Sequence, residues 1–196
     1  MGQDARVRYT KTVIRKAFFD LLKDTPLEKI TVKKICELAQ INRSTFYKYY
    51  YDVYDLFDNI KQDILIRLKN FVSNIHADSS REIMLKILGA VKSESETFEI
   101  ICSENGDLSF PSAVFDVCYS HVGPKFSARY PQLNDSQKQW LYHYISVGCS
   151  GVLRCWFESG MKETPEELCD FLEVILNNTL SFKQNTFKNG IHTFFV

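Results

Sequence analysis

The sequence lacks the features of membrane, secreted and catalytic classes. No stretch approaches the roughly 20 consecutive apolar residues that cross a bilayer, and the first residues, MGQDARVRYTKT, contain no apolar run of the signal-peptide type. We therefore expect a cytoplasmic protein with no membrane partner. Neither G-x-S-x-G, H-E-x-x-H, a glycine-rich phosphate loop nor a paired-carboxylate helix motif is present, so we expect neither enzyme activity nor a cofactor.

The cysteines also lack paired C-x-x-C spacing, so no disulfide framework is expected. Most of the six lie in apolar patterns typical of reduced, buried thiols. Cys118 and His121 are three residues apart on a predicted helix and suit Zn²⁺ or a thiophilic ion if further ligands converge on them. The candidates for that role are Cys102, His143, Cys149 and Cys155. Buried thiols and a hydrogen-bonded histidine explain the same residues, and we favour this interpretation, which predicts no metal site.

A net charge of zero conceals an asymmetry between the two ends of the chain. Residues 1–51 contain eleven Lys and Arg against five Asp and Glu, whereas the remainder contains thirteen bases and nineteen acids. A basic head on an acidic body is typical of a polyanion-binding module joined to a unit with another task. A solvated charged face explains the same asymmetry, so charge alone does not predict nucleic-acid binding.

Three helices are predicted in the head, and only a few residues separate the second from the third. Apolar residues recur at helical spacing over residues 12–23, and Pro26 follows. Thr31 is a good N-cap for a short helix through Ala39, and Asn42 can cap another from Arg43 to Tyr49. Such closely spaced helices must meet at a sharp angle, which is the geometry of a helix-turn-helix.

The aromatic segment INRSTFYKYYYDVYDL, residues 41–56, divides between two surfaces on this helix. Phe46 and Tyr50 share a face at i and i+4 and should be buried, and we also assign Tyr54 to the core. The exposed side then presents Arg43, Ser44, Tyr47 and Lys48. A guanidinium, an ammonium and hydroxyls on one face suit a DNA major groove and its phosphates.

TVKKICELAQINRSTFYKYYYDVYDL resembles the DNA-binding signature of the TetR-type repressors in register, and residue types, spacing and helix breaks together agree over about 45 residues. The matching residues are Thr31, Ile35, Ala39, Ile41, Thr45, Phe46, Tyr47, Tyr50 and Leu56. The resemblance implies base-edge contacts by Lys33, Arg43, Ser44 and Tyr47. It implies phosphate contacts by Thr31, Thr45, Lys48 and Tyr49.

Three positions depart from the family pattern. Gln40 replaces the usual turn Gly, and a non-Gly residue in a left-handed conformation costs roughly 1 kcal/mol or more. Tyr49 replaces a frequent His but retains a ring with a polar tip. Val53 replaces a Lys that meets a phosphate, which should lower the salt slope of DNA binding by about one unit.

The remainder reads as a string of helices, so the predicted fold class is all-α, with a head at residues 1–52 and a body at 53–196. The expected helices are 55–74, 83–91, 98–102, 113–130 with a break near Gly123 and Pro124, 137–158 closed by Gly160, and 165–182. Thr164 and Glu167 form a capping-box signal for the last one. The apolar end NGIHTFFV should pack back onto the body.

GVLRCWFESGMKETPEELCDFL resembles the ending of one C-terminal subgroup of these repressors. The resemblance implies a homodimer through the last two long helices, a palindromic DNA operator and a small-molecule effector bound in the body. The candidate pocket residues are Phe98, Cys102, Phe110, Phe115, Cys118, Tyr119, Trp140 and Tyr142, although an aromatic stripe is more often core. The alternative is an interaction protein of the same fold that has lost operator binding, which Gln40 and Val53 favour.

Overall fold

The computed structural model describes residues 2–75 and 79–179, without the side chains of residues 2–4 and 121–129. Within these residues the fold is all-α, as predicted, and no strand is present. The elements are α1 (Gly2–Leu22), the 3₁₀ turn η1 (Leu27–Lys29), α2 (Val32–Leu38), α3 (Arg43–Phe46), α4 (Val53–Ser73), α5 (Ser80–Ser93), α6 (Ser95–Ile101), α7 (Phe110–Arg129), α8 (Asp135–Glu158) and α9 (Pro165–Thr179).

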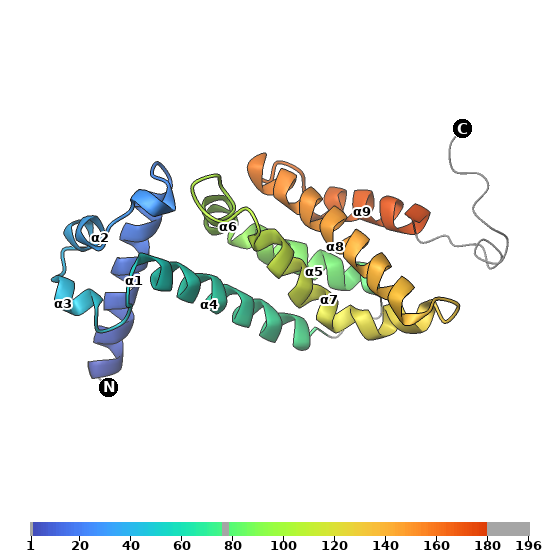
Figure 1. Ribbon diagram of the computed structural model, residues 1–196, viewed down its shortest axis with the longest axis horizontal. Helices are drawn as coiled ribbons and strands as arrows, with labels where there is room; N and C mark the ends of the chain where they lie inside the picture. The colour runs from blue at the N-terminus through green and yellow to red at the C-terminus, as the bar shows by residue number, and fades with distance from the viewer. Residues whose placement is uncertain (1, 76–78, 180–196) are drawn as a thin grey trace.

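A small head and a larger body are joined by one long helix (Figure 1). The head consists of α1, α2 and α3; the body consists of α5 to α9; and α4 runs from the head along the body, where it packs on α7. α8 packs on α7 and α6, and α9 packs on α5. Over most of their length α8 and α9 lie on the side of the body away from α4.

One continuous apolar core extends through head and body. Ile14, Phe18 and Leu22 on α1 are fully buried, and Phe18 meets Phe57 of α4 with ring centroids 5.5 Å apart. Burying a side chain of this size stabilises the fold by about 1.5 to 3 kcal/mol. The start of the long helix is therefore part of the core of the head.

Helix ends follow the capping residues that the sequence suggests. The Thr31 side chain accepts a hydrogen bond from the backbone of Lys34, and Gly160 takes φ +74° after α8. At α9 the Thr164 hydroxyl accepts from the Glu167 backbone at 3.2 Å, while the Glu167 carboxylate accepts from the Thr164 backbone at 2.8 Å. This capping box is confirmed. The predicted end of this helix at Phe182 and the packing of residues 189–196 lie outside the described residues.

Several helix limits differ from those predicted. α5, α6 and α7 each begin three residues earlier than expected, and three further differences have a physical reason. α1 begins at Gly2, because its added turns are solvated and carry no apolar periodicity to reveal them. α3 ends at Phe46, since the chain must turn at once to bury Tyr50 and enter α4, and Asn42 stands at the N-cap position without a side-chain capping bond. α7 continues through residues 123 and 124 instead of breaking there. The helical turns on both sides stabilise it by more than the loss of one backbone hydrogen bond at the proline costs.

Two aromatic side chains on α4 are exposed, and one of them, Tyr54, was expected in the core. On α4 the buried face continues through Leu68 to Val72, in steps of four, and this leaves Phe71 41% exposed. Tyr54 is 53% exposed, because Val53 directly before it on the first turn of α4 faces the core, and the next residue of a helix then points to a different side. The assignment of Tyr54 to the core was therefore wrong, whereas that of Tyr50 is confirmed.

Candidate nucleic-acid interface and body cavity

The connection between α2 and α3 is a tight left-handed turn. Gln40 has φ +54°, the Ile41 backbone donates to the Cys36 carbonyl at 3.0 Å, and the Gln40 backbone donates to Glu37 at 3.3 Å. These two bonds form a Schellman motif, which satisfies the last carbonyls of α2 and sends the chain into α3 at a sharp angle. The turn therefore has helix-turn-helix geometry although Gln occupies the position that favours Gly.

Two buried rings hold the α3 segment, residues 43–50, onto the core. Phe46 is 0% exposed and Tyr50 is 3% exposed, with ring centroids 5.6 Å apart. The Tyr50 hydroxyl lies beside the Arg15 guanidinium, which pairs with Asp63 on α4. Burial raises the pKa of Tyr50, so this hydroxyl stays neutral at physiological pH. The orientation of α3 is thus fixed from both α1 and α4.

The predicted DNA contacts gather on the opposite, solvent-facing side. Most are exposed and two are half-buried: the exposed ones are Thr31, Lys33, Arg43, Ser44, Tyr47 and Lys48, and the half-buried ones are Thr45 and Tyr49. Among the described residues neither Arg43 nor Lys48 makes an ion pair, while Lys33 lies 3.8 Å from Glu37. Two cations without internal partners beside phenol and hydroxyl groups leave their charge available to a polyanion.

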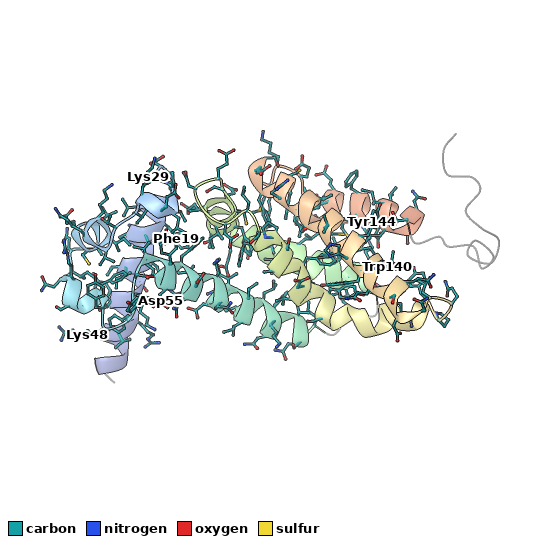
Figure 2. The ribbon with its side chains drawn as sticks, viewed as in Figure 1. Phe19, Lys29, Lys48, Asp55, Trp140 and Tyr144 are labelled. Atoms are coloured by element: carbon teal, nitrogen blue, oxygen red, sulfur yellow. The ribbon has the colours of Figure 1, made fainter. Side chains whose placement is uncertain are left out.

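The first turns of α1 extend this basic surface, although their residues were not among the predicted DNA contacts. Arg6, Arg8 and Lys11 are exposed, and no ion pair is present at these residues within the described part of the chain. The Lys11 ammonium lies 5.9 Å from the centroid of the Tyr49 ring, which places α1 beside the segment after α3. Figure 2 shows Lys48 at the same end of the head. Three bases without an acid between residues 5 and 12 were the available signal.

The N-terminus of α4 is closed by carboxylates and by an apolar residue. Asp52 accepts from the Asp55 backbone at 2.8 Å, and Asp55 (Figure 2) accepts from the Tyr51 backbone at 2.8 Å. Val53 is only 6% exposed. A helix end that already has two carboxylates beside it, one of which accepts from a first-turn N–H group, is a poor phosphate site. The buried Val53, which stands where the family pattern has a Lys that contacts a phosphate, therefore lies at a helix end that is not built to bind one.

The loop at residues 102–109, between α6 and α7, joins the body to the head. The Leu27 backbone donates to the Asn105 carbonyl at 3.0 Å, and the Asn105 side chain donates to the Lys23 carbonyl at 3.1 Å. On the other side of the loop, Asp107 pairs with Lys61 of α4 at 2.8 Å. Burial works against ionisation of Asp107, but this pair and hydrogen bonds from Ser109 hold the pKa of that carboxyl below its ordinary value.

A cavity of about 430 Å³ lies between α5, α7, α8 and α9. Of the eight predicted pocket residues, Phe115, Cys118 and Tyr119 line it. The others lie elsewhere: Phe98, Cys102 and Phe110 are in the core, Tyr142 lies outside the cavity wall with its ring 4.3 Å from that of Tyr119, and Trp140 is 69% exposed. Most of the lining was missed, because it comes largely from aliphatic residues of α5, α7, α8 and α9 that look like ordinary core.

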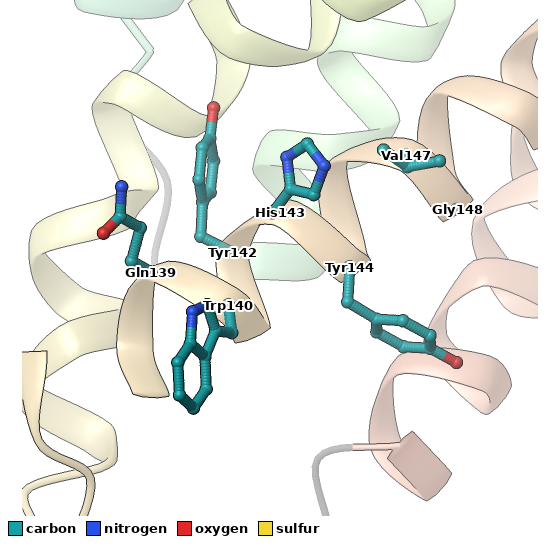
Figure 3. Close-up of a pocket in the computed structure, with 7 residues that line it drawn as sticks. All are labelled: Gln139, Trp140, Tyr142, His143, Tyr144, Val147 and Gly148. Carbon is teal, nitrogen blue, oxygen red and sulfur yellow. The ribbon is translucent and has the colours of Figure 1, made fainter. Parts of the chain in front are cut away.

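An apolar face on α8 and α9 has no partner within the described chain. Figure 3 shows Trp140 and Tyr144 on the opposite side of α8 from Tyr142. The large exposed apolar residues of the two helices are Trp140, Tyr144, Val147, Phe171, Val174 and Ile175. Gly148 and Gly151 leave open space where a side chain would stand, which permits close approach of another helix. Exposed apolar residues grouped in this way mark an interaction surface.

Metal and membrane sites gain no support from the described residues. No three His, Cys, Asp or Glu side chains there are grouped to bind a metal ion, and the side chain of His121 falls outside them. None of the helices in that part of the chain has the length and apolar character needed to span a bilayer.

Comparisons with known proteins agree with this architecture. Residues 78–178 match the family model TetR_C_8, described as a transcriptional regulator C-terminal region. A curated relative, the uncharacterized HTH-type transcriptional regulator YxbF of Bacillus subtilis (strain 168), is 21% identical over 164 residues, which is 79% of this chain and 41% of the relative. The chain thus spans less than half the length of that relative.

Three solved structures are similar in fold. A TetR transcriptional regulator from Streptococcus agalactiae 2603V has a TM-score of 0.68 at 22% identity, and the fatty acid degradation regulator FadR from Bacillus halodurans has 0.64 at 12%. In both cases 89% of this chain and 97% of the other is covered. The dihydroxyacetone kinase operon activator DhaS has a TM-score of 0.54 at 20% identity, covering 87% of this chain and 96% of its own.

Proposed function

We propose that this chain, which belongs to the TetR family of transcriptional regulators, binds a palindromic operator as a homodimer and releases it when a small molecule enters the body. The observation that carries the proposal is the division of residues 43–50 between two surfaces. Phe46 and Tyr50 are locked into the core, while Arg43 and Lys48 are exposed without ion-pair partners in the described chain. This arrangement presents a rigid cationic surface of helical shape.

In this proposal the exposed side chains divide the reading of DNA between them. Arg43 donates a bidentate pair of hydrogen bonds to a guanine edge, with Lys33, Ser44 and Tyr47 beside it on neighbouring bases. Phosphates are held by Thr31, Thr45, Lys48 and Tyr49, and Arg6, Arg8 and Lys11 add to the positive field. The Thr31 hydroxyl can do this while it caps α2, because it accepts from Lys34 and retains its own proton to donate.

The apolar face of α8 and α9 supports the homodimer. Two copies of the same face, related by a twofold axis, would bury Trp140, Tyr144 and their apolar neighbours against each other. Such an isologous pairing places two heads in a symmetric arrangement, so the matching operator is a palindrome.

The cavity and the 102–109 loop support control by an effector. α7 contributes Phe115, Cys118 and Tyr119 to the cavity and begins at the loop that contacts the head through Asn105. A molecule that binds more tightly when the heads are misplaced for DNA therefore lowers DNA affinity through this connection.

Selection of bound duplexes from a random pool, followed by the salt dependence of binding, tests the proposal. A palindromic consensus bound by two copies is the expected result. No enrichment, with only weak salt-sensitive binding, would instead favour an interaction protein that has lost operator recognition. The carboxylate-closed start of α4 is the observation that favours this second candidate.

The sequence resemblance predicts repression, whereas one structural neighbour is named as an operon activator. Transcription in vitro from a promoter that contains the selected operator decides between the two. We expect the transcript to decrease when the protein is added and to recover when the effector is present.

A further inference from the structure

One end of the body cavity is polar, and all its polar groups come from two helices. Ser80 and Arg81 lie on the first turn of α5, and Glu173 and Asn177 lie on α9. The remaining walls are apolar and are formed largely by aliphatic, aromatic and sulfur-containing side chains of α5, α7 and α8. The cavity therefore suits a molecule with an apolar body and a single polar end.

The polar end carries more negative than positive charge. Arg81 Nη2 lies 2.6 Å from Asp170 Oδ1, and Arg81 Nη1 lies 2.6 Å from Glu173 Oε2. These hydrogen bonds raise the pKa of Arg81, so the guanidinium is permanently charged and already occupied by two carboxylates. The ion-pair group of Arg81, Asp170 and Glu173 therefore has an excess of one negative charge. Glu173 is the carboxylate of this group that lines the cavity, whereas Asp170 is 64% exposed and lies outside the lining.

The other walls supply no positive charge to offset this excess. No Lys or His, and no Arg other than Arg81, lines the cavity among the described residues. Burial raises the pKa of Cys118 to about 12 and that of Cys149 to about 11, and it also raises the pKa of Tyr119. These groups are neutral at pH 7. A carboxylate that entered would lose its hydration without gaining a cationic partner, which is unfavourable.

We propose that the effector is an apolar molecule that ends in an ammonium group, with its chain in the cavity and its charge beside Glu173. This inference rests on the proposed function, because it names the chemical class for the same cavity. The volume of about 430 Å³ is toward the small end of the range for ligand sites, so a single alkyl chain or a small ring system fits the space.

Three probes with the same chain and different ends test the charge preference. Decylamine, 1-decanol and decanoate are titrated into the full-length protein at pH 7 by calorimetry, below their aggregation concentrations. We expect decylamine to bind most tightly and decanoate least. Binding of 1-decanol or decanoate as tight as that of decylamine, or no binding by any of the three, would overturn the inference.

Glu173→Gln isolates the proposed contact. It removes one of the two carboxylates but leaves Asp170 to hold Arg81, so we expect the ratio of decylamine to 1-decanol affinity to fall roughly three- to tenfold. Glu166→Gln, an exposed carboxylate on the same helix that does not line the cavity, is the matched control and should leave the ratio unchanged. An equal loss for both ligands in Glu173→Gln would mean that Glu173 does not select charge. Thermal unfolding without ligand confirms that both variants fold.

Operator selection is carried out without ligand, so the two proposals can fail separately. If the protein selects a palindrome but prefers decanoate, the proposed operator binding stands and the proposed ligand class is refuted. If it prefers decylamine but selects no duplex, the ligand class stands and the proposed operator binding is refuted.

Discussion

Arg43 and Lys48 are both exposed cations on the α3 segment, yet they should serve different purposes. A guanidinium presents a planar fork that matches the two acceptors of a guanine edge, whereas an ammonium is a flexible point charge suited to a phosphate. Specificity and general affinity therefore depend on separate residues of one short segment.

Replacing each residue by Ala should separate these two contributions. We expect Arg43→Ala to relax the preference at one base pair per half-site and to cost about 1 to 3 kcal/mol on the selected operator. Lys48→Ala should weaken binding to all sequences alike and lower the salt slope by about one unit per contact. Binding to the operator and to a scrambled duplex over a salt series measures both effects. An equal loss on both duplexes for Arg43→Ala would contradict its base-reading role.

At the scale of elements, the turn between α2 and α3 is held in a conformation that its residue does not favour. Gln40 adopts φ +54°, and a side chain with a Cβ in this region costs about 1 to 2 kcal/mol, while Gly loses about 0.5 to 1 kcal/mol of chain entropy. The Schellman bonds and the buried Phe46 maintain the turn despite this cost.

Gln40→Gly should consequently stabilise the protein by roughly 0.5 to 1 kcal/mol, measured by urea unfolding. Gln40→Ala is the matched control, since Ala retains the Cβ and should give no gain. Equal stabilisation by both substitutions would show that the left-handed backbone is not the source of the cost.

The loop at 102–109 is the second element with a testable contribution. Asp107 pairs with Lys61, and its pKa is lowered in the folded protein. A lowered carboxyl pKa adds stability above the unfolded value, near 3.9, and this contribution is lost as the pH falls through the folded pKa. The loop should therefore loosen in acid before the apolar core does.

Asp107→Asn should cost about 1 kcal/mol at pH 7, with the difference from the native chain shrinking as the pH falls below about 4. Asp58→Asn is a useful comparison, because Asp58 also meets Lys61 but is 67% exposed, and a surface pair of this kind contributes about 0.3 to 0.5 kcal/mol. Unfolding by urea at several pH values measures both. A cost for Asp107→Asn that does not change with pH would exclude the ion pair as its cause.

At the scale of the whole molecule, the arrangement of the helices distributes the proposed tasks along its length. The basic surface lies on the head, the cavity lies inside the body, and the apolar face lies on α8 and α9. Binding at one of these places can affect the others through α4, through the 102–109 loop and through the contact of α1 with α6, where Lys23 pairs with Glu96 at 2.7 Å.

Trp140→Arg should convert the proposed dimer into a monomer and reduce affinity for a palindromic duplex by at least tenfold, because the two half-sites are then bound independently. Ile66→Arg places the same charge on another exposed apolar residue, on α4 and outside the apolar face, and should change neither property. Sedimentation velocity and gel-shift titration provide the two readouts. A Trp140→Arg protein that remains dimeric would place the subunit interface elsewhere.

Local sequence determined the features that depend on neighbouring residues. The Thr31 cap, the Thr164 and Glu167 capping box, the all-α class and the buried pair Phe46 and Tyr50 all follow from spacings of three to five residues, which bring side chains together on one helix whatever the rest of the fold does. The TetR resemblance of the head has the same origin, since its pattern is contained in one continuous segment.

Only the tertiary structure decided features that depend on residues distant in sequence. The inward direction of α4 at Tyr54 and Phe71, the continuity of α7, and the division of the apolar residues between cavity, core and outer face depend on which helices pack together. Glu173 and Arg81 meet across 92 positions of chain, so no local pattern could reveal the charge of the cavity's polar end. Packing brings such residues together because the apolar faces of α5 and α9 must be buried, and the polar residues are carried with them.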